Sequence, residues 1–282
     1  MWGCVRPSRI IPLLAALVLT GAAAVAEAPQ RVVSVNLCTD QLALLLAAPG
    51  QIVSLSRLSH DAESSSMAAA ARAYPTNGSG AEEVYLLNPD LVLAGTFTAP
   101  TTVQMLRDLG IRVELFGPAR SLADVPDRIA RMGAVLGHEA EAEAMIAAFR
   151  AELARLSAAP DRRPRAALYY VNSYTLGDRT LAGDILRAAG FDNVAAEAGL
   201  EQGGTLALEH LILLAPEVIV SGRDYPGQAR AEEVLSHPAL RALPGTRVAG
   251  TLTDRDWICG TPLVLTAVEK MRALRLSLEI GE

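Results

Sequence analysis

The sequence predicts an α/β fold with two Rossmann-like lobes, whose parallel sheets are joined by a single long linking helix. The main observation is a stretch that occurs twice, as EEVYLLNPDLVLAG at 82–95 and as EHLILLAPEVIVSG at 209–222. In each copy a short apolar helix is stopped by proline, which lacks an N–H and pushes the preceding residue towards extended backbone. The continuous apolar run that follows is typical of a buried parallel strand. The copies lie too far apart for a solenoid, so they indicate a duplicated lobe.

The other elements of the first lobe alternate between strand and helix patterns. This alternation predicts a parallel sheet with helices on its faces. The expected elements are a strand at 31–37, a helix at 40–47 capped by Thr39, a strand at 52–55, a loop at 56–81 that holds one helix near 66–72, a helix at 101–109 and a strand at 111–115.

A linking helix is predicted by the pattern that begins at Ser121. Apolar residues recur there at helical spacing over 121–136 and again over 139–157. The second helix would be roughly 28 Å long at 1.5 Å per residue, which is enough to cross from one lobe to the other. We therefore expect an N-terminal lobe at 27–135, an interlobe helix at 136–160 and a C-terminal lobe at 161–282.

The second lobe repeats the order of strand and helix patterns, and its last helix begins with a proline in the first turn, where a missing N–H costs nothing. The expected elements are a strand at 166–171, a helix at 181–189, the second repeat copy, a short helix that begins at His237-Pro238, a strand at 247–252 and a closing helix at 262–278.

The first 26 residues have the pattern of a secretory signal peptide. Arg6 and Arg9 form a basic region, an apolar run follows at 10–24, and Ala24-Val25-Ala26 fits the small-x-small cleavage rule. A retained membrane anchor is the alternative, but the apolar run is shorter than the ~20 residues that a span needs. No cysteine lies near the cut, which disfavours a lipid anchor. We expect cleavage after Ala26 and export to the periplasm.

Composition narrows the class of function. The chain has 25 Lys and Arg against 31 Asp and Glu, and loss of Arg6 and Arg9 with the signal peptide would bring the net charge from −6 to near −8. An acidic surface disfavours nucleic acid and anionic membranes as partners. The sequence has no P-loop, no nucleophile elbow and no complete dinucleotide fingerprint. The missing motifs disfavour an enzyme, so we expect a protein that is not an enzyme. We further expect a monomer with no cofactor.

Two cysteines, Cys38 and Cys259, remain after the predicted cleavage. An even pair in an exported chain favours a disulfide, and two separate buried thiols are the alternative. The histidines are scattered, so no metal site is expected.

The order of these features resembles a known family. The predicted signal peptide, the run RVVSVNLCTDQLALLL, the two Glu-x6-Pro-acid units and the linking helix between them occur together in periplasmic substrate-binding proteins of ABC importers for iron complexes and cobalamin. The resemblance covers residues 31–275 and implies the class III periplasmic-binding-protein fold. It also implies a receptor that captures a ferric siderophore or cobalamin and hands it to an ABC permease in the inner membrane. Haem is an alternative ligand, and an exported two-lobed α/β enzyme is an alternative of another class.

The resemblance further implies that one surface acid on each lobe docks onto arginines of the permease. The matching positions are Glu82 and Glu209, although Glu83 follows Glu82 directly and could take its place. A structural explanation is also available for Glu82, because 79–82 reads as a capping box and an acid in the first helical turn is favoured by the helix dipole.

Candidate ligand-binding residues follow from the rule that open parallel sheets bind ligands beyond the carboxyl ends of their strands. Side chains at the predicted strand ends are aromatic, cationic or amide groups, which suit a large, flat, partly anionic ligand. His60 could ligate iron or cobalt, or lie in a solvated loop. The candidates are Asn36, Arg57, His60, Thr96, Phe97, Asn172, Tyr174, Arg223, Tyr225 and Trp257.

Overall fold

The computed structural model describes residues 2, 27–157, 159–222, 234–235, 237–241, 243, 245–249 and 252–279. The predicted signal peptide therefore lies outside the described residues, apart from Trp2. Two candidate ligand-binding residues, Arg223 and Tyr225, also lie outside them.

The N-terminal lobe is a five-stranded parallel sheet in the order β3-β2-β1-β4-β5. Successive apolar side chains of β4 point to opposite faces of the sheet. One face packs in a core with α1, and the other packs in a core with α3 and α4. The elements are β1 (Val32–Ser34), α1 (Leu37–Leu46), β2 (Ile52–Ser56), a 3₁₀ turn η1 (Arg57–His60), α2 (Ala68–Ala71), β3 (Thr76–Asn77), α3 (Ala81–Leu86), β4 (Leu91–Gly95), α4 (Pro100–Asp108) and β5 (Arg112–Phe116).

The C-terminal lobe is a six-stranded sheet in the order β11-β10-β6-β7-β9, with β8 also paired to β6. Strands β6, β8, β10 and β11 are parallel, whereas β7 and β9 join antiparallel at one side, so this sheet is mixed. The elements are β6 (Arg165–Tyr170), η2 (Val171–Ser173), β7 (Tyr174–Thr175), α7 (Leu181–Ala188), β8 (Asp192–Asn193), α8 (Val194–Glu197), β9 (Gly204–Thr205), α9 (Leu208–Leu214), β10 (Val218–Val220), α10 (Pro238–Arg241), β11 (Arg247–Ala249), α11 (Asp254–Trp257), η4 (Pro262–Val264) and α12 (Leu265–Glu279).

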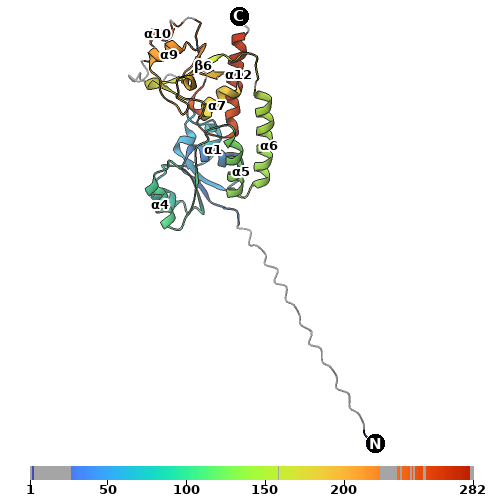
Figure 1. Ribbon diagram of the computed structural model, residues 1–282. Coiled ribbons are helices and arrows are strands. Elements are labelled where there is room, and N and C mark those ends of the chain that lie inside the picture. The colour runs from blue at the N-terminus through green and yellow to red at the C-terminus, as the bar shows by residue number, and fades with distance from the viewer. Residues whose placement is uncertain are drawn as a thin grey trace.

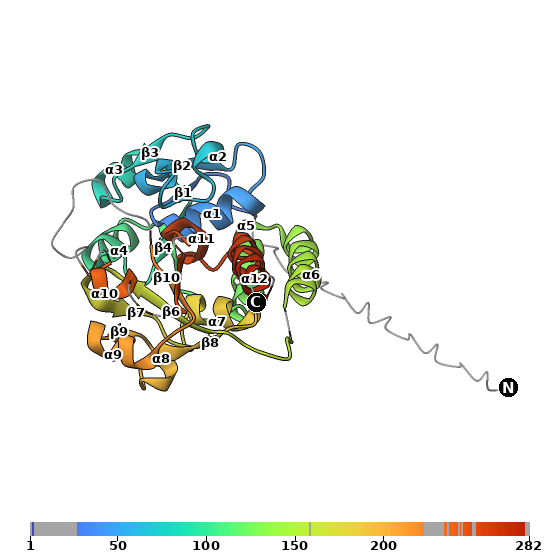
Figure 2. The ribbon, with the colours of Figure 1, turned by 90° about the horizontal axis from the view of Figure 1, so that it is seen from above.

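The predicted linking helix is α6 (Glu139–Leu156), which follows α5 (Asp124–Leu136). Gly137, with φ 80°, ends α5 in the left-handed conformation that glycine adopts without strain. Helix α6 packs on α5 and on α12. Figure 1 shows it upright along one side of the two lobes, and Figure 2 shows it from above on the same side. One continuous apolar core runs through α1, α5, α6, α7 and α12, so the two lobes share buried surface.

Both copies of the repeat form the predicted helix–proline–strand unit, as α3–β4 and α9–β10. The sequence pattern predicted extended backbone at the residue before each proline, and the structure differs there. Asn88 and Ala215 instead have φ values of 49° and 44°. A left-handed residue at this point ends the helix and satisfies its last carbonyls, which explains the departure from the usual preference.

Two predicted helix starts also differ in the structure. The capping box at 79–82 does not form, because Gly80 is the N-cap of α3 and the Ser79 hydroxyl donates to the Val35 carbonyl at 3.1 Å. Helix α1 begins three residues earlier than predicted, and its cap is Asn36, whose side chain accepts from the Cys38 and Thr39 amides at 3.0 and 3.4 Å.

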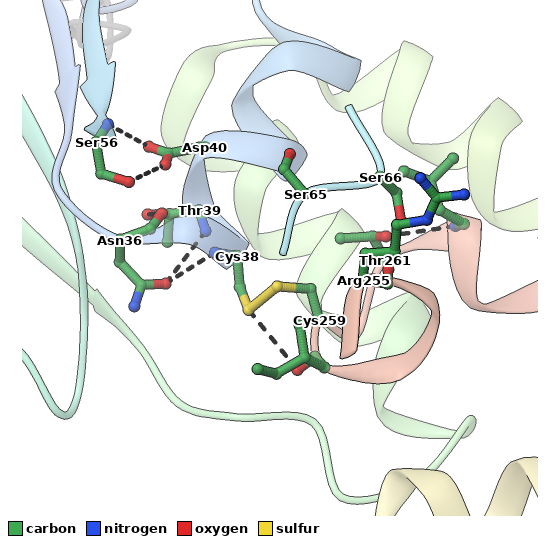
Figure 3. Close-up of a disulfide and its surroundings, with 12 residues drawn as sticks. Asn36, Cys38, Thr39, Asp40, Ser56, Ser65, Ser66, Arg255, Cys259 and Thr261 are labelled. Atoms are coloured by element: carbon green, nitrogen blue, oxygen red, sulfur yellow. Dashed lines mark hydrogen bonds between the residues drawn. A yellow bond between two sulfur atoms is a disulfide. The ribbon is translucent and has the colours of Figure 1, made fainter. Parts of the chain in front are cut away.

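A segment of the C-terminal lobe, which we name the strap (254–260), crosses to the N-terminal lobe (Figure 3). Cys259 forms a disulfide with Cys38 at the start of α1, as predicted, and the two Cα atoms are 5.0 Å apart. The Ser66 hydroxyl donates to the Arg255 carbonyl, and the Arg255 guanidinium donates to the Ala62 carbonyl at 3.3 Å. The strap is therefore fastened to the N-terminal lobe at both ends.

Gly260 lies where the strap passes closest to the N-terminal lobe. A Cβ at this position would lie 2.1 Å from the Cβ of Ala119, which is too close for two carbons that are not bonded to each other. The close approach of these two segments therefore requires glycine at position 260.

Gly260→Ala should destabilise the protein by about 1–3 kcal/mol, because the strap or the chain at Ala119 must move to admit the methyl group. Gly117→Ala is the matched control, since nothing lies within 4 Å of a Cβ placed there. Urea unfolding of both variants in their oxidised form measures the difference. Equal stability of the two variants would show that the contact is not tight.

Asp40 is a fully buried carboxyl on α1 that ties this helix to the end of β2. Its oxygens accept from the backbone N–H of Ser56 at 3.2 Å and from the Ser56 hydroxyl. Burial raises the pKa of Asp40 from 3.8 to about 7, against the opposing effect of the hydrogen bonds and of His60.

The raised pKa of Asp40 predicts that stability falls as pH rises from about 4 to 7. In that range the folded protein holds a proton that the unfolded chain has released, so the slope approaches ~1.4 kcal/mol per pH unit. Asp40→Asn resembles the protonated carboxyl and does not titrate: its amide oxygen can accept from the Ser56 N–H, and its amide nitrogen can donate to the Ser56 hydroxyl oxygen. Urea unfolding between pH 4.5 and 7.5 should therefore show a steeper fall for the parent chain than for this variant, while the exposed control Asp108→Asn should follow the parent chain.

Candidate ligand-binding cleft

A cavity of about 530 Å³ lies at the carboxyl ends of the strands of the N-terminal lobe. All five strands contribute to it through their last residue or through the residues directly after it, as the rule for open parallel sheets predicts. The strap closes the cavity from the other lobe. Its lining consists of Val35, Asn36, Leu37, Cys38, Ser56, Arg57, Leu58, Asn77, Gly78, Ser79, Gly95, Thr96, Phe97, Phe116, Gly117, Pro118, Ala119, Arg128, Ile258 and Gly260.

Asn36 has two roles in this cavity. It caps α1, and its side chain lies against Gly95, where an added Cβ would be 2.8 Å from the Asn36 amide nitrogen. The absence of a side chain at Gly95 thus lets the segments after β1 and β4 meet at the cavity wall.

Asn77 holds the neighbouring wall together and is fully buried. Its amide nitrogen donates to the Ser34 carbonyl, the Ser54 hydroxyl and the Leu55 carbonyl, each at 3.0 Å, and its oxygen accepts from the Ser79 N–H at 3.0 Å. These bonds fix Ser79 in a left-handed conformation with φ 63°. Strained residues of this kind persist only where the surroundings hold them, and here they shape the loop after β3.

A second cavity of about 230 Å³ adjoins the first, because Ala119 and Ile258 line both. Its wall contains Trp257, whose ring centroid lies 5.7 Å from that of Tyr170. Its lining consists of Ala119, Arg120, Arg179, Thr180, Leu181, Ala182, Gln202, Trp257 and Ile258. The two cavities together form a cleft between the lobes. The first cavity is its mainly apolar part, and the second, with Arg120 and Arg179 in its lining, is its arginine-lined part.

The structure brings half of the predicted ligand-binding residues to this cleft. Asn36, Arg57, Thr96 and Phe97 line the first cavity, and Trp257 lines the second. Phe97 is 87% exposed, so its ring is available to a ligand. Asn172 and Tyr174 line neither cavity.

His60 is turned away from the cleft. Its Nε2 lies 2.9 Å from the Ala71 carbonyl and 3.2 Å from the Tyr74 carbonyl, so the ring holds α2 and the following turn against η1. His60 therefore lines neither cavity, because the 3₁₀ turn after β2 places Arg57 at the first cavity and His60 against the loop behind it.

Sequence reasoning missed three kinds of lining residue. Asn77 ends a two-residue strand inside a stretch predicted as loop, and Phe116 ends β5, whose carboxyl end could have been included by the same rule as the others. Arg128 comes from the helix α5 and not from a strand end, so no pattern in the sequence indicated it.

The acids predicted to dock are both exposed, each in the first turn of its helix. The neighbouring Glu83 instead accepts from the Gly78 N–H at 2.7 Å, beside the cavity. In the described part of the chain no helix combines the length and the apolar character needed to cross a membrane. Nor do three or more His, Cys, Asp or Glu residues of the described ranges gather as a metal site.

The chain matches proteins of one family in sequence and in fold. A family model described as "Periplasmic binding protein" matches residues 32–248. A cobalamin-binding protein of Halobacterium salinarum is 32% identical over 199 residues, which cover 69% of this chain and 54% of that protein. The match thus spans about half the length of this relative.

Solved structures share the fold at lower identity. A periplasmic haem-binding protein of Vibrio cholerae superposes with a TM-score of 0.72 and 21% identity, over 87% of this chain and 98% of that one. A periplasmic vitamin B12-binding protein of the same organism has a TM-score of 0.63 and 18% identity, over 87% and 96%. The two lobes and their linking helix have the class III arrangement, and the chain belongs to the periplasmic binding protein family.

Proposed function

We propose that this chain is the substrate-binding component of an ABC importer and that it carries cobalamin or an iron complex to a permease in the inner membrane. The observation that carries the proposal is the cleft, in which all five strand ends of one lobe and the strap of the other surround a cavity of about 530 Å³. That volume lies within the range of small-molecule sites. The chain acts in the periplasm after cleavage behind Ala26, as a monomer and without catalysis.

Cobalamin is the first candidate ligand. The relative that is 32% identical is a cobalamin-binding protein, and the cleft offers aromatic faces, amides and arginines to a large ligand with polar edges. Haem and ferric siderophores are the other members of the same ligand class.

The mature chain should bind cyanocobalamin at a ratio of one to one in titration calorimetry. Haemin and a ferric hydroxamate, titrated in parallel, separate the three ligand types, and each has its own absorbance spectrum. Saturable binding of haemin alone would assign the cleft to haem, and failure of all three ligands to bind would contradict the proposed function.

Two matched helices present the proposed docking surface. Glu82 on α3 and Glu209 on α9 are each followed four residues later by a leucine, Leu86 and Leu213, and both leucines are 81% exposed. Residues four apart share one face of a helix, so each lobe offers a carboxylate beside an apolar side chain. Figure 2 shows α3 and α9 on the side of the molecule away from α6.

The duplicated surface suits a two-fold symmetric partner. Exposed leucines are normal singly, but the same acid–leucine pair in both lobes is consistent with selection for contact. Glu82 is the N-terminal docking acid in this proposal, because the Glu83 carboxylate is already engaged by Gly78. Arginines on the permease would meet one carboxylate from each lobe.

The double variant Glu82→Arg, Glu209→Arg should abolish uptake of the ligand while its affinity and melting temperature stay close to those of the parent chain. Rim charges govern encounter and register more than stability, and α3 has no side-chain cap to lose. Uptake, calorimetry and thermal melting on one preparation measure the three properties.

The matched control is Glu139→Arg, Glu143→Arg, which makes the same change of charge on exposed residues of α6. Its uptake should equal that of the parent chain. If uptake survives in a well-folded Glu82→Arg, Glu209→Arg protein, the two acids are not docking points.

A further inference from the structure

Arg128 is a cation of the cleft for which the described residues supply no hydrogen-bond or salt-bridge partner. Its side chain reaches the first cavity from the second turn of α5. Its Nε atom is buried and has no hydrogen-bond partner. Within the described residues the guanidinium makes no hydrogen bond or salt bridge, although burying an unpaired donor costs free energy.

Other arginines of the described chain show the contrast. Each of the following pairs with a carboxylate, as arginine normally does at a protein surface: Arg112, Arg131, Arg155, Arg162, Arg163, Arg165, Arg179 and Arg187. An arginine keeps its charge when it is buried, so Arg128 faces the cavity as a cation.

Asp124, one turn before Arg128 on α5, already accepts two backbone hydrogen bonds. One oxygen of Asp124 accepts from the N–H groups of Arg120 and Ser121 at 2.7 and 3.0 Å. Burial lowers the pKa of Arg128, and the charge of Asp124 offsets this only in part. The cavity is the side from which a further partner can reach the guanidinium, because Arg128 lines it.

The strap fixes the direction of this side chain. The Cδ of Arg128 lies 3.4 Å from the place a Cβ would take at Gly260, so the aliphatic stem is confined between α5 and the strap. Arg57, the other arginine of this cavity, is exposed. Its guanidinium and the Glu83 carboxylate both lie beside Gly78. Arg57 thus has an acid near it, and Arg128 is the inner cation of the cavity.

We propose that Arg128 binds an oxyanion of the ligand, a phosphate or a carboxylate, and so selects ligands that carry one at the end that enters the cleft. A guanidinium confined in this way presents donors in a plane, which matches the two oxygens of either group. The inference rests on the proposed function and narrows its ligand to an anionic one. In cobalamin the group would be the phosphodiester, and in haem it would be a propionate.

The test compares each ligand with a version that lacks the anion. Cyanocobalamin carries the phosphodiester and dicyanocobinamide lacks it. For Arg128→Gln we expect the affinity for cyanocobalamin to fall by about 10- to 100-fold, the usual effect of losing a charged hydrogen bond, and the affinity for dicyanocobinamide to change less than about twofold. Arg128→Lys should lie between, because lysine keeps the charge and loses the planar fork.

Arg155→Gln is the control. Arg155 lies on α6, pairs with Glu152 at 2.6 Å and lines neither cavity, so its loss should leave both affinities unchanged. Melting temperatures of all variants identify any that fold poorly. An equal loss for both corrinoids, or no loss for cyanocobalamin, would overturn the assignment of Arg128.

The outcome also separates this inference from the proposed function. If the parent chain binds haemin and not the corrinoids, haemin and its dimethyl ester provide the same comparison, with a selective loss for haemin expected in Arg128→Gln. A parent chain that binds corrinoids normally while Arg128→Gln loses nothing contradicts the anion site alone. A parent chain that binds none of these compounds contradicts both.

Discussion

The strap on which the cleft depends is held in place by one covalent bond and one steric contact. The disulfide joins Cys259 to Cys38 at the first turn of α1, and Gly260 lets the strap pass against Ala119 with no side chain between them. Both contacts lie beside the cavity, and three of these residues line it. A disulfide across a loop of this length restricts the unfolded chain. In the entropic model this stabilises the folded protein by roughly 5 kcal/mol. Stability and the shape of the site are therefore set by the same few residues.

The shared core makes the relation between the lobes a property of the fold. One apolar cluster continues from α1 and α5 through α6 into α7 and α12, and Asp184 of α7 accepts from the Leu122 N–H at 2.8 Å just before α5. Large hinge motion needs loop residues that absorb backbone rotation, and a packed helix resists it. The fold therefore favours a cleft that is nearly preformed.

The charges of the cleft divide into two kinds. At the rim, Arg57 is exposed and lies near an acid, whereas the half-buried Arg128 lies beside the strap, and its Nε has no hydrogen-bond partner among the described residues. An apolar wall of Phe97, Phe116 and Ile258 surrounds them. Electrostatic interactions strengthen where water is excluded. The anion site proposed at Arg128 therefore lies in the part of the cleft with the least solvent contact, whereas the rim and the apolar wall provide contact area.

The sequence by itself determined the two lobes, the linking helix and the repeated helix–proline–strand unit, because each depends on local periodicity and on proline, which act over a few residues. It also predicted the Cys38–Cys259 pair and, through the strand-end rule, Asn36, Arg57, Thr96 and Phe97. Only the tertiary structure decided that His60 turns to backbone carbonyls, that Asn36 rather than Thr39 caps α1, and that Arg128 of a helix reaches the cavity. The direction of a side chain depends on the packing of segments distant in sequence, as Gly260 against Arg128 illustrates, and no local pattern records that contact.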